Sequence, residues 1–471
     1  MRNLLALAVA ILVTSSVSAC FADQPSLAMA ASQDTVTMKI VSSEVCDDPV
    51  VHLKDYDQGT YEIVEMDSFE KYQDQKTLNY TRYAYFFKTK VVQGHRYAWS
   101  FNSSNHLGPY NFKIRDLTGS INPRFIQIGD MEYGYYSNET LKALNGMDWD
   151  KYDGLIHVGD FAYNLEFDDC TRGDFFFNSM SSVHPVTPCY FILGNHENYN
   201  NGKMFNYRFR MAGYNTKYEN HFTSQIRGRV FFLYVNYDYV LKMFPERFNE
   251  VIAFLDSELE KSKTPDIKWR VVVTHRPIYC GEYATRSDCT LNYYKFKAFE
   301  QLYRKHGVDI MISGHEHFYE RLTILDDQFR FAEVDQKIGN MKAEITNSEH
   351  PIQLTNGCAG NHEFVDPDLK VAGFTSNSIA WIQCYADIEF TEDSIIHQLK
   401  ASRDGTVMDT TIIHKKPKST FAWISLVYLG IFIAATMLVF FAYKSMGIQK
   451  EDLNTSDACY SAPLPDRQTI R

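Results

Sequence analysis

Five short apolar runs in this chain of 471 residues each stop at a glycine or threonine that is followed by aspartate, asparagine or histidine. Short apolar runs bounded in this way are typical of buried β-strands. They cover 125–128, 155–158, 190–193, 271–273 and 308–312. Because the carboxyl ends of parallel strands meet at one edge of a sheet, we expect the polar residues that follow to converge there. The sequence therefore predicts an open α/β sheet with a site at its carboxyl edge.

The residues that follow the runs are of the types that bind metal ions. They are Asp130, Asp160, Asn195, His275, His315 and His317. Tyr163 stands three residues after Asp160, a spacing that brings both side chains to one point at the start of a helix or turn. Alone, Tyr163 is more typical of a packed core residue, and only the neighbouring motifs make it a candidate ligand. His196 follows Asn195 directly, and by itself is more typical of a structural residue.

Helical and strand-like segments surround these motifs. Helical patterns at 138–145, 247–261 and 294–306 lie between the runs, where crossovers between parallel strands require them. Strand-like pieces follow His317, at 329–334, 342–345, 353–355, 379–390 and 394–400. These pieces predict a second sheet, so that 119–414 forms a β-α-β sandwich.

The segment before the first run is predicted to be a small β-sandwich over 33–118, similar to fibronectin type III domains. Its strand-like pieces are separated by turn signals, and no helical period competes with them. They cover 35–41, 50–53, 61–64, 82–91, 97–101 and 110–114. No cluster of candidate ligands lies here, so we expect this domain to pack against the next one and frame it.

The amino-terminal residues 1–22 have the pattern of a secretory signal peptide. A charged start is followed by apolar residues 4–13 and by a small-residue site, which predicts cleavage after Ala19 or a few residues on. The apolar run is short for a transmembrane anchor. A bacterial lipoprotein signal with Cys20 as the modified residue is the other alternative.

Residues 421–443 carry no charge and are long enough to cross a bilayer core of about 30 Å as a helix. Trp423, Tyr428 and Tyr443 stand near the ends, as interfacial aromatics do. We therefore expect a transmembrane helix, a cytosolic tail at 444–471 and a single-pass type I membrane protein. Its bulk would be extracellular or lumenal, at the cell surface or in a lysosome or vacuole.

Other features agree with a secreted domain. Asparagines in glycosylation sequons are Asn79, Asn102 and Asn138. The formal net charge of -11, with dispersed basic residues, argues against nucleic acid as a partner. Disulfides are expected between Cys280 and Cys289, between Cys170 and Cys189, and between Cys358 and Cys384, which leaves Cys46 over. The absence of a Cys-x-x-Cys pair weakens thiolate metal binding.

Taken together, the six residues after the runs and Tyr163 resemble the seven metal ligands of the purple acid phosphatases, within the calcineurin-like metallophosphoesterases. The Arg-Pro-Ile-Tyr-Cys run after His275 is most similar to the animal-type branch. The resemblance implies one metal held by Asp130, Asp160, Tyr163 and His317. It implies a second held by Asp160, Asn195, His275 and His315, with Asp160 as the bridge.

The resemblance also implies the chemistry. Two carboxylates and a phenolate suit Fe(III), whereas amide and imidazole donors suit a divalent ion such as Fe, Zn or Mn. With such a pair of metals the protein would hydrolyse phosphate monoesters. The substrate would be a small phosphate ester or a phosphoprotein. His196 would contact the substrate as the catalytic residue. The alternatives are a phosphodiesterase or nucleotide hydrolase on the same fold, or a catalytically silent receptor or adhesin.

Two departures from the family pattern stand out. Glu132 occupies a position where the family usually has glycine, which leaves the turn after Asp130 open. Plant-type relatives carry further active-site histidines between the fourth and fifth motifs. Here no histidine occurs between His275 and His306, so the source of a proton for the leaving group stays open.

Overall fold

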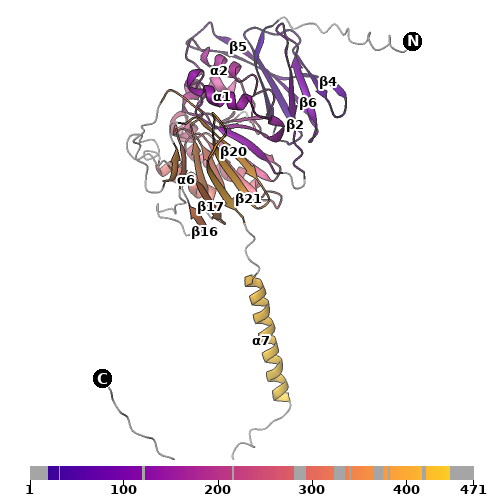
Figure 1. The fold of residues 1–471 in the computed structure, drawn as a ribbon, viewed down its shortest axis with the longest axis vertical. Helices are drawn as coiled ribbons and strands as arrows, with labels where there is room; N and C mark the ends of the chain where they lie inside the picture. Colours follow the sequence, from indigo (N-terminus) through magenta and orange to yellow (C-terminus); the bar gives the residue numbers. More distant parts are fainter. Residues whose placement is uncertain are drawn as a thin grey trace, which may run out of the picture. The chain divides into compact units, whose positions relative to one another are not determined.

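The structure is a computed structural model of the whole chain. It describes 20–30, 32–118, 122–214, 217–279, 293–322, 335–338, 341–348, 350–363, 375–379, 382–415 and 421–445. The chain divides into two units, Met1–Lys415 and Lys416–Arg471. The first unit contains a β-sandwich and an α/β part (Figure 1).

The β-sandwich consists of seven strands whose pairings are all antiparallel. They are β1 (Ala22–Met29), β2 (Thr35–Ser42), β3 (Val50–Asp55), β4 (Thr60–Gln73), β5 (Thr81–Lys90), β6 (Arg96–Phe101) and β7 (Leu107–Lys113), in the order β1-β2-β5-β4-β3-β6-β7. The first half of β4 pairs with β3 and its second half with β5, so this long strand passes from one layer to the other. The predicted β-sandwich is confirmed, and β1 is an additional strand.

Two mixed sheets form the α/β part. The first has the order β10-β9-β8-β20-β21-β22-β17-β16 and the second the order β11-β12-β13-β14-β18-β15-β19. The strands of the first are β8 (Arg124–Ile128), β9 (Gly154–His157), β10 (Cys189–Phe191), β16 (Asp335–Ile338), β17 (Lys342–Thr346), β20 (Cys384–Phe390), β21 (Ser394–Ala401) and β22 (Val407–His414). Those of the second are β11 (Phe222–Arg227), β12 (Val230–Val235), β13 (Trp269–Thr274), β14 (Ile310–Ser313), β15 (Tyr319–Leu322), β18 (Ile352–Asn356) and β19 (Thr375–Ile379).

The five predicted strands are present, but they do not share one sheet. β8, β9 and β10 lie parallel in the first sheet, and β13 and β14 lie parallel in the second. The sheets face each other across an aromatic core, in which Phe125 and Phe232 have ring centroids 5.0 Å apart and Phe232 and Phe390 5.7 Å. The expectation of a single open sheet is therefore wrong, and the predicted two-sheet sandwich is right.

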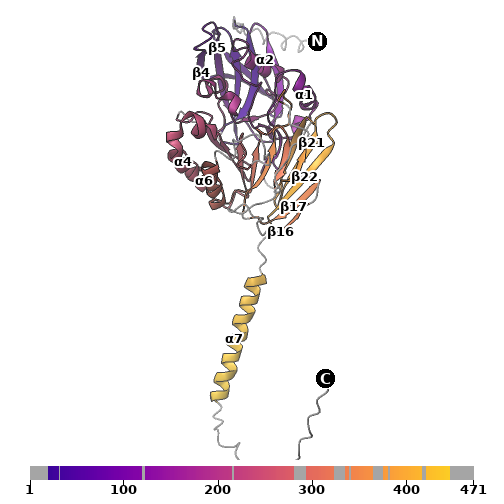
Figure 2. The same ribbon diagram turned by 90° about the vertical axis from the view of Figure 1, so that its left-hand side faces the viewer.

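The main helices are α1 (Asn138–Asn145), α2 (Arg172–Ser179), α3 (Lys203–Asn206), α4 (Phe248–Lys261) and α6 (Tyr293–Lys305). Helices α1, α4 and α6 match the three predicted helical patterns closely, whereas α2 and α3 were not predicted. Helices α4 and α6 lie side by side on the side opposite β21 and β22 (Figure 2). Val251, Leu255 and Leu259 of α4 are buried in one cluster with residues of β12 and β13. The expected strand at 329–334 falls outside the described residues.

A buried polar cluster joins the β-sandwich to the α/β part. The carboxylate of Asp174 accepts hydrogen bonds from Tyr80 at 2.9 Å, Arg82 at 2.9 Å and Arg208 at 2.7 Å. Trp99 of β6 donates to the carbonyl of Pro185 at 2.9 Å. Because buried charges are costly unless paired, these contacts hold the two parts in one arrangement. The predicted framing role of the β-sandwich agrees with this interface.

The disulfides differ from the expected pairs. Cys358 bonds to Cys384 as expected, whereas Cys46 bonds to Cys20. The expected bridge between Cys170 and Cys189 is wrong, because both are free and buried. The Cys189 thiol, at the start of β10, instead points at the carbonyls of Thr187 and His184. The expected Cys280–Cys289 bridge lies outside the described residues.

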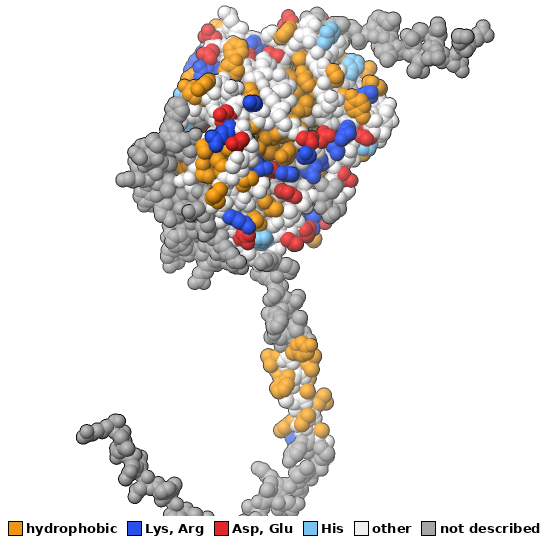
Figure 3. Space-filling view, viewed as in Figure 1, with side chains coloured by type: hydrophobic (Ala, Val, Ile, Leu, Met, Phe, Trp, Pro, Cys, Tyr) orange, Lys and Arg blue, Asp and Glu red, His pale blue; other side chains and the backbone are white. Residues whose placement is uncertain are grey.

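The second unit contains helix α7 (Phe421–Ser445), which covers the predicted span at 421–443. Exposed hydrophobic side chains lie along it, with backbone and other atoms visible between them (Figure 3). Within the part of the chain that the structure describes, no helix meets the length and hydropathy needed to cross a membrane.

Candidate metal centre

Four of the seven predicted ligands lie at sharp backbone turns. Asp130, Asp160, Tyr163 and His315 all have positive φ angles, between 54° and 72°. Such angles are uncommon for residues other than glycine and are often found at functional sites. Glycines beside them allow a close approach. A Cβ on Gly194 would lie 2.1 Å from Oδ1 of Asp160, and one on Gly314 would lie 2.3 Å from Oδ2 of Asp130.

One group of candidate ligands consists of Asp130, Asp160 and His317, with ligand atoms within 4.8 Å of one another. The hydroxyl of Tyr163 lies 2.9 Å from Nε2 of His317, which itself lies 3.6 Å from Oδ1 of Asp130. The carbonyl of Glu363 accepts the hydrogen bond of His317 Nδ1 at 2.9 Å. That contact leaves Nε2 of His317 facing the carboxylate and the phenol.

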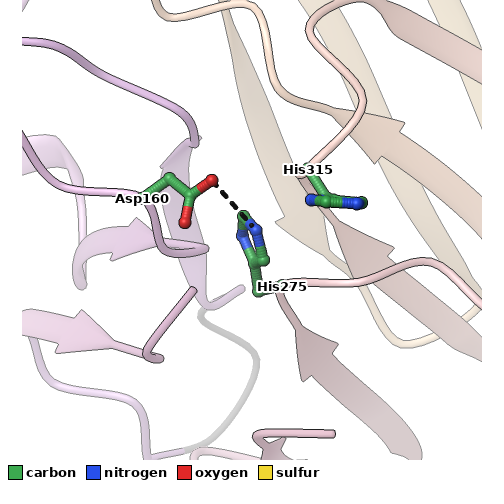
Figure 4. A group of neighbouring side chains, drawn as sticks. All are labelled: Asp160, His275 and His315. Carbon is green, nitrogen blue, oxygen red and sulfur yellow. Dashed lines mark ion pairs between the residues drawn. The ribbon is translucent and has the colours of Figure 1, made fainter. Parts of the chain in front are cut away.

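The other group consists of Asp160, His275 and His315, again with ligand atoms within 4.8 Å (Figure 4). Oδ2 of Asp160 lies 3.2 Å from Nε2 of His275. Oδ1 of Asn195 lies 2.9 Å from the same nitrogen. Because Asp160 belongs to both groups, it stands where a bridge between two ions would stand. The structure thus brings together all seven residues that the sequence singled out.

The chemistry of these atoms fits a cation. Nδ1 of His275 donates its proton to the carbonyl of Val158 at 2.9 Å, so Nε2 is the ring nitrogen that faces the site. Nε2 faces oxygen atoms of Asp160 and Asn195, and Oδ2 of Asp160 is buried. A proton or a metal ion between these atoms satisfies all three of them. Buried charges are retained where they are paired or coordinate metals.

Burial and mutual repulsion perturb the acidity of these groups. Burial and the neighbouring charge of Asp160 raise the pKa of Asp130 well above its ordinary value. Burial also raises the pKa of the Tyr163 phenol, and both carboxylates add to the effect. For Asp160, burial acts in the same direction, but the imidazoles of His275 and His196 outweigh it and lower its pKa. A cation at this point would stabilise all three anionic forms.

His196 lies at the edge of the site. Its backbone N–H donates to Oδ1 of Asp160 at 3.0 Å, and its Nδ1 lies 2.7 Å from Oδ1 of Asn164. Nε2 lies 3.8 Å from Oδ2 of Asp160, farther than the corresponding atom of His275. The side chain is one-fifth exposed, whereas that of His275 is buried. His196 therefore lies beside the candidate ligands with part of its side chain exposed.

Two supporting residues were not expected from the sequence. Glu197 is buried, and its carboxylate accepts the backbone N–H groups of Asp160, Phe161 and Gly194 at 2.8–2.9 Å. It thereby ties the loop after β9 to the loop after β10. Arg276 is also buried and donates to Nε2 of His315 at 2.8 Å, while its guanidinium pairs with Asp238 at 2.8 Å. Glu197 follows the predicted site residue His196, and Arg276 follows the predicted ligand His275. This adjacency is the sequence feature that could have indicated a role in the site.

The residues beyond His317 have a packing role. Arg321 and Asp409 are both fully buried and form an ion pair at 2.9 Å, and Tyr319 donates to the same carboxylate at 2.6 Å.

Glu132 resolves the open question about the turn after Asp130. Its backbone N–H donates to the carbonyl of Gly360 at 2.8 Å, and its carboxylate accepts from the backbone and the ring of His362 at 2.8 Å and 2.7 Å. Glu132 is not among the residues with positive φ, so the turn needs no glycine at this point. Its side chain instead fastens the loop that carries Glu363.

Comparisons with known proteins agree with this site. Residues 123–319 match the family model described as calcineurin-like phosphoesterase. The acid phosphatase type 7 of Mus musculus is 28% identical over 304 residues, which cover 60% of this chain and 65% of that protein. The Fe(3+)-Zn(2+) purple acid phosphatase 12 of Arabidopsis thaliana is 24% identical over 306 residues, covering 60% of this chain and 61% of that protein. The chain thus spans slightly less than two thirds of these relatives.

A solved structure supports the fold over a longer range. The purple acid phosphatase PPD1 of yellow lupin (Lupinus luteus) superposes with a TM-score of 0.67 at 18% identity, covering 85% of this chain and 75% of that one. This coverage extends over both the β-sandwich and the α/β part. Residues 123–319 thus match the calcineurin-like phosphoesterase family, and the chain is similar in sequence to acid phosphatases type 7 and in fold to a purple acid phosphatase.

Proposed function

We propose that this protein is an acid phosphatase of the purple acid phosphatase type, which hydrolyses phosphate monoesters at a centre of two metal ions. The observation that carries the proposal is the shared carboxylate of Asp160, which belongs to two groups of ligand atoms at once. Two cations held there would acidify a water molecule and neutralise the charge of the phosphate. Hydrolysis of p-nitrophenyl phosphate by the purified protein, together with its metal content, tests this function.

The residues divide between the two ions as the resemblance implies. Asp130, Asp160, Tyr163 and His317 would hold one ion. Asp160, Asn195, His275 and His315 would hold the other. The hydrogen bond from Nδ1 of His275 to Val158 supports this division, because it fixes the ring with Nε2 toward Asp160.

We assign Fe(III) to the first position and a divalent ion, Fe, Zn or Mn, to the second. The first set contains two carboxylates and a phenol, which are hard anionic donors, whereas the second adds neutral amide and imidazole donors. Burial raises the pKa of Tyr163 well above its ordinary value, so ionisation of this phenol requires a strongly charged cation. The similar Fe(3+)-Zn(2+) purple acid phosphatase 12 of Arabidopsis thaliana is named for such a pair of ions.

His196 is proposed to touch the substrate, either as a hydrogen-bond donor to phosphate or as a proton donor to the leaving group. We expect His196→Ala to lower kcat about 10²-fold while both metals stay bound, since a positioned acid or base contributes about that much. Metal analysis and kinetics of the same preparation measure the two effects. His52→Ala, in the β-sandwich, is the control. Loss of metal from His196→Ala would show that the residue belongs to the metal-binding framework.

We further propose that the protein enters the secretory pathway and is cleaved after Ala19, since a later cut would remove Cys20 and its bond to Cys46. Lipidation of Cys20 would compete with the same bond. The sequons at Asn79, Asn102 and Asn138 would carry glycans added in the secretory pathway. Asn79 and Asn138 lie exposed on the described surface.

Helix α7 is proposed to anchor the protein in a membrane as a type I protein, because residues 421–443 are uncharged over a length of about one bilayer core. We expect the full chain to remain with membranes during an alkaline carbonate wash. A variant that ends at Lys415 should be released into the medium as an active enzyme. Release of the full chain by the same wash would contradict an anchor.

A further inference from the structure

A cavity of about 460 Å³ adjoins the candidate metal centre. Its described lining comes from the segment that leads into α1, from the loop after β18 and from residues just before β20. The lining residues used below are Tyr135, Tyr136, Glu139, His317 and Glu363. The volume is within the range of small-molecule sites in proteins.

The cavity is connected directly to the metal ligands. His317 forms part of its wall, and the carbonyl of Glu363 accepts the hydrogen bond of His317 Nδ1 at 2.9 Å. A phosphate ester whose phosphate lies at the candidate metal centre can therefore extend its alcohol part into this cavity.

The chemical character of the cavity favours a cation. Among its described lining residues, Glu139 and Glu363 bring negative charge and none is lysine or arginine. Tyr135 and Tyr136 add two aromatic rings, and Tyr135 is 85% exposed. Carboxylates attract an ammonium group and repel a second anionic group on the substrate. Aromatic faces attract quaternary and primary ammonium groups in the same way.

We propose that this cavity binds the alcohol part of the substrate and selects phosphate monoesters of amino alcohols, which carry a cationic ammonium group. The proposal rests on the proposed phosphatase function. In the reaction, the oxygen of water forms a bond to phosphorus and the ester P–O bond breaks. The amino alcohol leaves with one proton of that water, and inorganic phosphate keeps the rest. Esters whose alcohol part carries a carboxylate or a further phosphate would be poor substrates.

The test compares three esters with the full-length protein. They are phosphocholine, p-nitrophenyl phosphate with a neutral alcohol part, and 3-phosphoglycerate with an anionic one. We expect the wild type to have a higher kcat/KM for phosphocholine than for 3-phosphoglycerate. Glu139→Gln should lower kcat/KM for phosphocholine about fivefold and raise it for 3-phosphoglycerate, so that the preference for the cationic ester falls. This variant keeps the sequon of Asn138 and Thr140.

Two controls make the outcome specific. Glu139→Asp keeps the charge and should keep the preference, and Glu246→Gln changes an exposed carboxylate before α4 and should change nothing. Equal kcat/KM for the cationic and anionic esters in the wild type would overturn the proposal without needing any variant. A preference that Glu139→Gln leaves unchanged would also overturn it. If p-nitrophenyl phosphate is not hydrolysed at all, the proposed function itself fails.

Discussion

Asp160→Ala should lower the turnover of p-nitrophenyl phosphate by more than about 10³-fold, because it removes the carboxylate common to both groups of ligands. Both ions should be lost or bound more weakly, since the remaining residues divide into two incomplete sets. Kinetics and elemental analysis of the same purified sample check the two effects. Asp266→Ala, at an exposed aspartate far along the chain from these motifs, should behave like the wild type.

Retained activity and metal in Asp160→Ala would contradict the assignment of Asp160 as the bridging ligand. Glu197 holds this loop through the backbone N–H groups of residues 160 and 161, which the substitution leaves in place. The loop should therefore keep its conformation, and a lost activity should reflect the lost ligand. If the variant retains two metals and normal turnover, Asp160 is not the bridge.

Tyr163→Phe should remove the visible colour of the protein. A phenolate bound to Fe(III) absorbs visible light by charge transfer, so we expect a pink to violet wild type and a colourless variant. Asp130, Asp160 and His317 remain in the variant, and iron should partly stay bound. An absorption spectrum and an iron assay distinguish loss of colour from loss of metal.

Tyr237→Phe provides a matched control, because Tyr237 is another buried tyrosine whose hydroxyl lies 2.9 Å from that of Tyr303 rather than from a candidate ligand. Its colour should equal that of the wild type. A wild type that contains iron but is colourless would mean that Tyr163 is only a packed residue. The first ion would then have no phenolate ligand.

The local elements could be predicted from the sequence because they depend on short-range patterns. The helices at 138–145 and 247–261 differ from α1 and α4 by at most one residue at either end. The division of the strands between two sheets could not be predicted, because pairing β8 with β20 joins residues more than 250 positions apart. The apolar runs alone contain no information about that pairing.

The cysteine pairs show the same limit. Cys170 and Cys189 are close in the sequence, yet the chain between them forms α2 and both thiols remain free. Cys20 was assigned to the cleavage region, so its bond to Cys46 was missed. Whether two cysteines meet depends on strand pairing, which spacing does not encode.

The candidate ligands could be predicted from the sequence, but the residues that hold them in position could not. Most of the predicted ligands come after a strand and one small residue, glycine or threonine. This pattern can be read directly from the sequence. Glu197 accepts hydrogen bonds from backbone N–H groups, and Arg276 donates one to the ring of His315. These contacts form only once the loops have folded. Glu132 departs from the family pattern, in which glycine is usual. In the folded protein its carboxylate forms a hydrogen bond with His362, a contact that glycine could not make.

The central claim, a metal-dependent phosphomonoesterase, is tested most directly by one assay on the purified protein. Turnover of p-nitrophenyl phosphate and of bis(p-nitrophenyl) phosphate is measured beside the metal content per chain. We predict about two metal ions per chain and faster hydrolysis of the monoester. Faster hydrolysis of the diester would indicate a phosphodiesterase on the same fold. A protein without bound metal that hydrolyses neither ester, even after metals are added, would contradict the account.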